Sequence, residues 1–231
     1  MEYVGQELDL VKEVHNWRSY WGKNIEAYLG EEVLEVGAGL GSNTRHLIKN
    51  EKIKRWVCIE PDVKLSSQIE RSIDGKEVVV YTGLLKDYPI ENKFDSILYI
   101  DVIEHIEDAE SELELAKKYL KPGGHLIILV PAYNFLFNEF DKAIGHFRRY
   151  NKKMLRASLP EGMKLKSLFY LDSMGFFASL VNKLFLHQDL PSIKQIQFWD
   201  RVIVPFSKIT DVFLFRSMGK SLIGIWEKRD H

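Results

Sequence analysis

The chain has 231 residues and a formal net charge of -1, with 45% hydrophobic and 28% charged residues. These values are ordinary for a folded protein and exclude disorder and collagen-like structure. The single cysteine, Cys58, excludes an internal disulfide and favours a reducing compartment. The length favours one domain, 1–231, with an elaborated subdomain.

The beginning of the sequence predicts a cytoplasmic protein. Glu2, Glu7 and Asp9 lie within the first ten residues, whereas a secretory signal peptide starts with positive charge. No uninterrupted apolar run approaches the roughly 18 residues of a membrane span. The near-zero net charge argues against bulk attraction to nucleic acid.

Short apolar runs alternate with helical patterns over the first 130 residues. Five runs rich in Val, Ile and aromatic residues are expected to be strands: Glu32–Val36, Arg55–Ile59, Glu77–Tyr81, Phe94–Ile100 and His125–Val130. Strands that alternate with helices are joined by right-handed crossovers into a parallel sheet. The preceding segment, 1–30, carries Trp17, Tyr20 and Trp21, and is expected to be a helical lid or a helix packed on the core.

The second half of the chain is richer in aromatic and basic residues. Two more strands are expected at Lys164–Tyr170 and Ser221–Glu227, with a mostly helical insertion, 171–218, between them. Apolar residues recur in this insertion at helical spacing, at Met174, Phe177, Val181 and Leu184. Such a stripe suits an acceptor lid, a dimer surface or an interfacial membrane helix, and core packing is the simplest explanation.

A glycine-rich turn, Gly37-Ala38-Gly39-Leu40-Gly41, follows the first expected strand and leads into a helix. Glycines let the backbone approach a ligand closely, and the helix N-terminus offers unpaired N–H groups. Ser42 stands where the dinucleotide fingerprint G-x-G-x-x-G has its third glycine, so the loop misses the pyrophosphate pattern. Glu35, just before the loop, would repel a pyrophosphate but suits a cationic ligand.

Another acidic residue, Glu60, followed by Pro61, ends the second expected strand. A carboxylate at that position can accept hydrogen bonds from both hydroxyls of a ribose. A ribose with a nearby positive charge and no phosphate describes S-adenosylmethionine. An NAD-dependent oxidoreductase is disfavoured by Ser42 and Glu35.

Together these motifs resemble class I S-adenosylmethionine-dependent methyltransferases. The residues that carry the resemblance are the loop from Glu35 to Gly41, Glu60, Phe94–Ile97, Asp101–His105 and Leu120–Gly124. The resemblance implies an α/β fold with a doubly wound, seven-stranded, mostly parallel sheet whose last strand is antiparallel. A further segment, 143–150 with the sequence AIGHFRRY, resembles a bacterial subgroup of that family.

Cofactor contacts are implied by the same resemblance. The methionine part would lie against residues of the loop and its flanks: Glu35, Gly37, Ala38, Gly39, Gly41 and Asn43. Glu60 and Pro61 would bind the ribose, and Asp101 would lie near the methionine part and the acceptor. Relatives often carry an acidic residue for the adenine amino group where this chain has Leu84 and Leu85. Backbone and apolar packing are therefore expected to hold the adenine.

Transfer of an activated methyl group needs in-line positioning, exclusion of water and, for a hydroxyl or a protonated amine, a general base. The candidate catalytic residues are His146, Asp141 and His105. Each has an alternative role, because His146 can cap a turn, His105 can balance an acidic helix and Asp141 can pair with an arginine. No Cys/His spacing typical of zinc occurs, so no metal is expected.

Charge is unevenly distributed along the chain. Residues 1–130 carry 16 Lys and Arg against 24 Asp and Glu, whereas residues 131–231 carry 16 against 9. A basic run is most often a solvated face. The functional hypothesis is an anionic acceptor bound by Arg148 or Arg149, with Tyr133 and Tyr150 as further contacts.

We therefore expect a methyltransferase for a small-molecule or glycan-type acceptor, with transfer to oxygen favoured slightly over nitrogen and S-adenosylhomocysteine as product. No nucleic-acid partner is expected, whereas peripheral membrane contact and a homodimer stay open. The alternative from another class is a non-catalytic scaffold protein that binds the cofactor without turnover.

Overall fold

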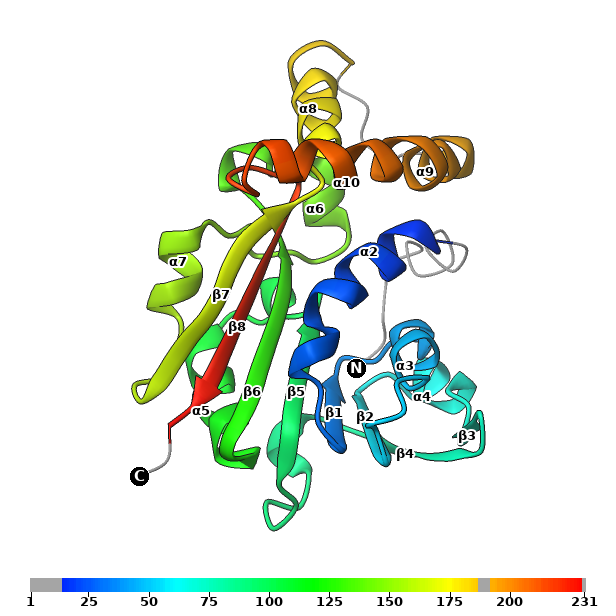
Figure 1. Cartoon of the computed structure of the whole chain (residues 1–231), viewed down its shortest axis with the longest axis vertical. Coiled ribbons are helices and arrows are strands. Elements are labelled where there is room, and N and C mark those ends of the chain that lie inside the picture. The colour runs from blue at the N-terminus through cyan, green and yellow to red at the C-terminus, as the bar shows by residue number, and fades with distance from the viewer. Residues whose placement is uncertain (1–13, 187–191, 230–231) are drawn as a thin grey trace.

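The computed structural model describes residues 14–186 and 192–229, so the first part of the expected lid, 1–13, lies outside the described residues (Figure 1). Its centre is one eight-stranded sheet in the order β3-β4-β2-β1-β5-β6-β8-β7. The strands are β1 (Glu32–Val36), β2 (Arg55–Glu60), β3 (Ser72–Ile73), β4 (Lys76–Thr82), β5 (Phe94–Ile100), β6 (Leu120–Pro131), β7 (Met163–Leu171) and β8 (Ser221–Lys228).

Most of the sheet is parallel. Strands β4, β2, β1, β5 and β6 run in one direction, and β8 is antiparallel to both of its neighbours, β6 and β7. The expected α/β class with an antiparallel last strand is confirmed. The strand order turns at β1, which pairs with β2 on one side and with β5 on the other. In open α/β sheets, ligands bind beyond the carboxyl ends of the strands at such a point.

The expected strand count of seven is wrong by one. The short strand β3 forms an antiparallel hairpin with the start of β4. Asp74 and Gly75 connect the two strands with φ of 50° and 76°, which is the backbone of a two-residue hairpin turn. The Asp-Gly pair is a sequence signal for such a hairpin.

Helices cover both faces of the sheet because its strands are apolar on both sides. On one face, α2 (Asn16–Ile25) and α3 (Ser42–Leu47) pack against a core that includes Val33, Trp56 and Leu98. On the other face, α5 (Ala109–Tyr119) and α7 (Lys152–Ala157) pack against Leu34 and Ile97. The remaining helices near the sheet are α4 (Val63–Gln68) and α6 (Glu139–Ala143).

Among the described residues between β7 and β8 there are three helices and two π-helical turns, as expected for the insertion. They are α8 (Ser173–Val181), the π-helix Asn182–Leu186, α9 (Ile193–Phe198), the π-helix Trp199–Ile203 and α10 (Val204–Phe213). We call residues 173–218 the cap. Figure 1 shows the cap at the top of the molecule, beyond the end of the sheet where β6 leads toward α6.

Buried acidic residues attach the cap to the rest of the fold. Asp211, fully buried, accepts hydrogen bonds from the Tyr20 hydroxyl at 2.8 Å and from the backbone N–H groups of Asp172 and Ser173, each at 2.8 Å. Asp200 accepts from the backbone N–H of Trp17 at 2.9 Å, at the first turn of α2. The cap is therefore anchored to both β7 and α2 by charge-assisted hydrogen bonds.

Candidate functional site

The glycine-rich loop after β1 has the backbone that its sequence predicts. Gly37, Gly39 and Gly41 have φ of 71°, 56° and 71°, a region that side chains with a Cβ rarely adopt. A Cβ on Gly37 would also lie 2.6 Å from Cγ2 of Val102. The loop can therefore follow this path only with glycine at its first position.

A cavity of about 330 Å³ opens behind this loop, at the carboxyl ends of β1 and β5. Its walls come from α2, the loop, the turn after β5, the segment around α6, the cap and the start of β8. The cap contributes Ile196 and Trp199, and α2 contributes Trp17, Arg18 and Trp21. This placement agrees with a site at the point where the strand order turns.

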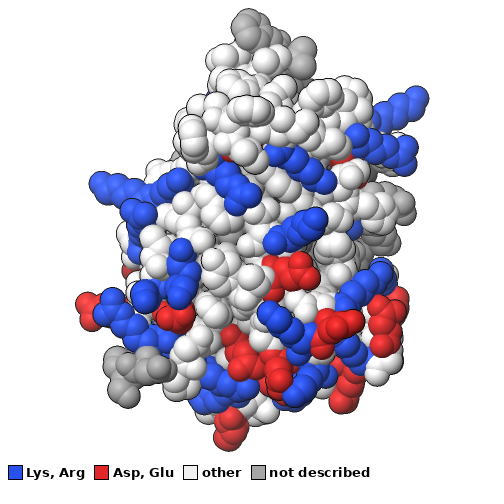
Figure 2. Space-filling view, viewed as in Figure 1, with Lys and Arg blue, Asp and Glu red and all other residues white. Residues whose placement is uncertain are grey.

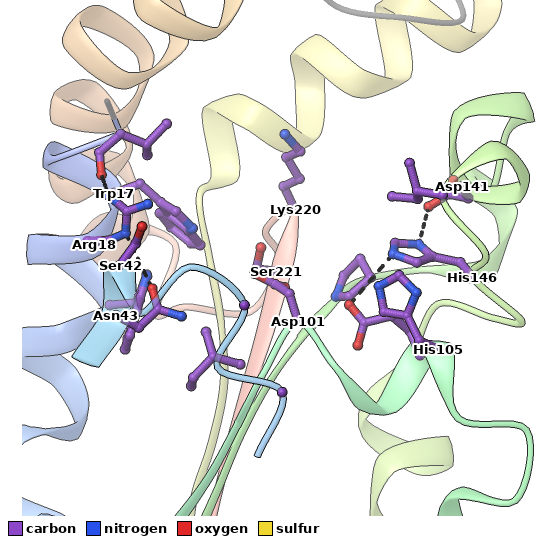
Figure 3. Close-up of a pocket in the computed structure, with 18 of the residues that line it drawn as sticks. Trp17, Arg18, Ser42, Asn43, Asp101, His105, Asp141, His146, Lys220 and Ser221 are labelled. Atoms are coloured by element: carbon purple, nitrogen blue, oxygen red, sulfur yellow. Dashed lines mark hydrogen bonds and ion pairs between the residues drawn. The ribbon is translucent and has the colours of Figure 1, made fainter. Parts of the chain in front are cut away.

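One side of the cavity is lined by Arg18, Ser42 and Asn43 (Figure 3). Arg18 is 8% exposed and donates hydrogen bonds from Nη1 to the Val14 carbonyl at 2.7 Å and from Nε to Oδ1 of Asn43 at 3.3 Å. These contacts hold a guanidinium beside the glycine loop and the N-terminus of α3. A ligand carboxylate would be stabilised here by both the charge and the helix end.

The two strand-end glutamates lie under the loop and do not line the cavity. Glu35 accepts from the Thr44 hydroxyl at 2.5 Å and from Nε1 of Trp56 at 3.2 Å. Glu60 accepts from the backbone N–H groups of Gly39 at 2.7 Å and Asp62 at 2.9 Å. Burial raises the pKa of Glu35 to about 7. Glu60 therefore fixes the loop, whereas Glu35 joins β1 to α3 and β2.

The opposite side of the cavity is built around His146 (Figure 3). Nδ1 of His146 lies 2.8 Å from Oδ1 of Asp141, which also forms an ion pair with Arg149 at 2.8 Å. Burial would raise the pKa of Asp141, but hydrogen bonds from His146 and Arg149 hold it below its ordinary value. A carboxylate can only accept, so Nδ1 carries the proton and Nε2 is left facing Glu104 at 3.9 Å.

Glu104 is the most unusual side chain of the site. It is fully buried, and neither carboxylate oxygen has a hydrogen-bond partner among the described residues. Burial raises its pKa well above the ordinary range, and the nearby carboxylates of Asp101 and Asp141 add to the shift. Buried carboxylates are normally paired, so this one indicates a group that binds there.

Two charged residues lie between the sides of the cavity, Asp101 after β5 and Lys220 before β8 (Figure 3). Asp101 has φ of 53° and is exposed where it lines the cavity; partial desolvation by the surrounding protein raises its pKa to about 6, against the opposing effect of His146 and Lys220. Burial lowers the pKa of Lys220, whose Nζ lies 4.6 Å from the ring centroid of Trp199. Both are placed to contact a bound acceptor.

Nine of the sequence candidates line this cavity: Gly37, Ala38, Gly39, Asn43, Asp101, His105, Asp141, His146 and Arg149. Other candidates lie outside it. Leu85 and Tyr150 are buried in the core, Leu84 is 42% exposed, and Tyr133 stacks on Tyr170 with 4.9 Å between ring centroids. Gly41 is the N-cap of α3, and Pro61 follows Glu60 outside the lining.

The two adjacent arginines point in different directions. Arg148 donates to the backbone carbonyls of Ile106 at 3.0 Å and Glu107 at 2.7 Å, outside the cavity. Arg149 lines the cavity, but its charge is neutralised by Asp141. Neither guanidinium is therefore placed as a free partner for an anionic acceptor.

Cavity residues that sequence reasoning did not assign to the site include Arg18, Ser42, Glu104, Trp199 and Lys220. Glu104 was grouped with the acidic helix that follows it, because charge patterning alone does not separate a buried carboxylate from a solvated one. Arg18 lies next to Trp17, in the segment that was expected to cover the cofactor. The sequence feature that could have indicated Arg18 as a site residue is its positive charge among the aromatic residues of this helix.

Residues 14–177 match a family model described as a methyltransferase domain. The chain belongs to the methyltransferase-domain family. Among curated relatives, a demethylmenaquinone methyltransferase of Tropheryma whipplei is 30% identical over 162 residues, covering 69% of this chain and 62% of the relative. Phosphoethanolamine N-methyltransferase 3 of Arabidopsis thaliana is 35% identical over 103 residues, covering 43% of this chain and 21% of the relative. The matched region spans less than two thirds of either relative.

Solved structures of this family share the fold at low sequence identity. A chain in the complex of the Haloferax volcanii Trm112 methyltransferase activator with a methyltransferase has a TM-score of 0.66 and 16% identity, over 97% of this chain and 96% of that one. Coclaurine N-methyltransferase bound to N-methylheliamine and SAH has a TM-score of 0.64 and 12% identity, over 99% and 83%. The resemblance to class I S-adenosylmethionine-dependent methyltransferases is confirmed, and that of 143–150 to a bacterial subgroup stays a prediction.

Proposed function

We propose that this chain is an S-adenosylmethionine-dependent methyltransferase that transfers the methyl group to a hydroxyl of its acceptor. The observation that carries the proposal is the single cavity that joins the glycine loop to the Asp141–His146 pair. One side of it offers backbone N–H groups and Arg18, and the other offers an imidazole held in a defined orientation. A methyl transfer to oxygen needs both a site that positions the cofactor and a base near the acceptor oxygen.

The loop side fits the cofactor. Arg18 would bind the carboxylate of the methionine part, and the positive-φ glycines leave room for the ligand against the backbone. Glu60 would exchange one of its backbone hydrogen bonds for the ribose hydroxyls. S-adenosylmethionine supplies a methyl group already activated by its sulfonium charge.

The acceptor would lie between Asp101, Lys220 and His146. Nε2 of His146 is oriented to receive the proton of an acceptor hydroxyl, because Asp141 holds Nδ1. Lys220, rather than Arg148 or Arg149, is the cation placed to attract an anionic group of the acceptor. A base beside the acceptor favours oxygen over nitrogen, because a hydroxyl must lose its proton to become a good nucleophile, whereas a neutral amine can attack with its lone pair and lose its proton afterwards.

Calorimetric titration with S-adenosylmethionine and NAD tests the cofactor assignment. We expect saturable binding of S-adenosylmethionine and none of NAD. Transfer of a labelled methyl group into fractionated extract of the source cells then identifies the acceptor. Binding of NAD in preference to S-adenosylmethionine would contradict the proposal, and tight cofactor binding without transfer to any acceptor pool would favour a scaffold protein.

Gly37→Ala is expected to weaken S-adenosylmethionine binding at least about tenfold, because the new Cβ combines a strained φ with a 2.6 Å contact to Val102. Gly75→Ala is the matched control, since Gly75 has φ of 76° but nothing within 4 Å of the added Cβ. Calorimetry on both variants measures the difference. Equal cofactor affinity in the two variants would show that the loop does not hold the cofactor.

The cap has an apolar outer surface. Eleven of the seventeen large hydrophobic side chains exposed among the described residues lie between Phe177 and Phe215. In the last part of the cap they recur at helical spacing, at Phe198, Val202, Phe206, Ile209 and Phe213, whereas Asp200, Ser207 and Asp211 are buried on the inner side. This is the reverse of the usual amphipathic pattern, in which polar residues face outward.

In the described part of the cap, 173–186 and 192–218, the exposed charges have one sign. Its acidic residues in the described ranges, Asp200 and Asp211, are buried, and its exposed or half-exposed charged residues are Lys183, Lys194, Arg201, Lys208 and Arg216. Figure 2 shows the upper part of this face as mostly uncharged with blue residues, and most of the red residues in the lower half. Apolar side chains with basic residues complement an anionic lipid surface. None of the helices in the described ranges is long and apolar enough to cross a membrane.

We propose that the cap docks on anionic membranes and that the acceptor is an amphiphilic molecule reached from there. Co-sedimentation with phosphatidylcholine vesicles, with and without phosphatidylglycerol, tests this. We expect binding to the anionic vesicles, weakened about tenfold or more by the double change Phe206→Ser and Phe213→Ser. Val63→Ser, at a side chain 69% exposed on α4, is the control. A dimer in solution that the double change dissociates would instead identify a second copy as the partner.

A further inference from the structure

Three side chains of the acceptor side form a compact set of potential metal ligands. Glu104, His105 and His146 each offer one ligand atom, and these atoms all lie within 4.8 Å of one another. The two imidazole rings are in contact, with 4.5 Å between their centroids. Donors bound to one cation at about 2.1 Å lie roughly 3.0 to 3.5 Å apart, so small side-chain movements would close the set around an ion.

Glu104 shows that this set is incomplete without a ligand. Its carboxylate is fully buried, and neither oxygen accepts a hydrogen bond from the described residues. The nearest cationic side chain is no substitute, because Arg149 directs its N–H groups to Asp141. A buried carboxylate that lacks partners is destabilising unless a cation or a donor binds it.

Both histidines are already oriented as ligands. Asp141 accepts from Nδ1 of His146 at 2.8 Å, which directs Nε2 toward Glu104. The ligand atom of His105 lies within 4.8 Å of those of Glu104 and His146, and its ring lies edge-on against the His146 ring, with 4.5 Å between the ring centroids. A carboxylate or carbonyl behind the imidazole is the usual second partner of a metal-bound histidine.

We propose that Glu104, His105 and His146 bind a divalent transition-metal cation in the acceptor side of the cavity. Two imidazoles and one carboxylate favour Zn²⁺, Mn²⁺ or Fe²⁺ over Mg²⁺ or Ca²⁺, which prefer oxygen ligands. Three protein ligands leave positions open toward the cavity, as in catalytic rather than structural sites.

The cation would act on the acceptor hydroxyl. Bound to the acceptor oxygen, it would lower the pKa of that hydroxyl and hold the oxygen in place for methyl transfer. This role rests on the proposed function. The cation, instead of Nε2 of His146, would promote loss of the proton from the acceptor hydroxyl. The sequence predicts no metal, because it contains no Cys/His spacing typical of zinc.

Equilibrium dialysis of the full chain against Zn²⁺ or Mn²⁺, followed by elemental analysis, tests the site. We expect one cation per chain in the unmodified protein and none in Glu104→Gln or His146→Asn. Asp141→Asn keeps the three ligands but loses the hydrogen-bonded anion behind His146, so its cation affinity should fall about 10- to 100-fold. His125→Gln is the matched control, because His125 also lies near a carboxylate, 3.7 Å from Glu227, but outside the cavity.

Thermal unfolding provides a second measurement on the same variants. The Tm of the unmodified protein should rise on addition of Zn²⁺, and that of Glu104→Gln should not. A variant that fails to fold would be recognised here, and the other ligand variant, together with Asp141→Asn, would then decide.

Cation binding that is unchanged in Glu104→Gln and His146→Asn would overturn the proposal. The proposal would also be overturned if the protein bound no cation and, after treatment with a chelator, still bound S-adenosylmethionine and transferred its methyl group at full rate. The second result would leave the proposed function intact, with His146 as the base. A chain that binds the cation but not S-adenosylmethionine would instead overturn the proposed function.

Discussion

Replacement of His146 by alanine is expected to lower the rate of methyl transfer by a factor on the order of 10² to 10⁴, which is typical for loss of proton-transfer assistance. Affinity for S-adenosylmethionine should stay unchanged, because His146 lies on the side of the cavity opposite to Arg18 and Asn43. The rate is measured with the acceptor identified by labelled transfer. The loss is expected whether Nε2 receives the proton or binds a cation.

The controls separate this effect from a general loss of structure. His125→Gln removes a histidine outside the cavity and should leave both the rate and the cofactor affinity unchanged. Asp141→Asn keeps the shape of the pair but weakens the orientation of His146, so it should reduce the rate less than His146→Ala. If His146→Ala transferred methyl groups at the original rate, His146 would have no role in the reaction.

The largest expected effect on stability comes from Asp211→Ala. Its carboxylate accepts from the Tyr20 hydroxyl and from the backbone N–H groups of Asp172 and Ser173, and all of these lie inside the protein. Their loss leaves buried donors without partners, so the free energy of unfolding should fall by about 3 to 5 kcal/mol. Urea denaturation measures the change.

Two further variants calibrate that measurement. Asp211→Asn keeps one accepting oxygen and nearly the same volume, so its loss should be clearly smaller. Asp87→Ala removes an exposed carboxylate and should change the free energy of unfolding by no more than about 0.5 kcal/mol. If Asp211→Ala unfolded like Asp87→Ala, the network would not be what holds the cap to β7 and α2.

The fold and the loop side of the site could be predicted from the sequence, because the residues that indicate them lie close together in the chain. Phe94–Ile100 is an apolar run, and the structure gives β5 the same bounds. The glycines after β1 stand at alternate positions within five residues, and their spacing does not match the pyrophosphate pattern. The hairpin at Asp74 and Gly75 was equally local but was not interpreted as a turn.

The acceptor side could be predicted only in part, because it depends on which way neighbouring side chains point. Arg148 and Arg149 are adjacent and chemically identical, yet only Arg149 reaches the cavity. Glu104 follows β5 in a short 3-10 turn, where no helical or strand periodicity indicates its direction. Its approach to His146 crosses some forty residues of chain, and no motif spacing spans that distance.

Asp172 and Lys220, at the two ends of the cap, are joined by a backbone hydrogen bond of 2.9 Å from the Lys220 N–H to the Asp172 carbonyl. The intervening segment thus leaves the sheet and returns to it at a single point. Segments with such closely spaced ends can be lengthened, shortened or exchanged with little strain on the strands that carry them. The geometry therefore allows the length of the cap to change while β7 and β8 keep their places in the sheet.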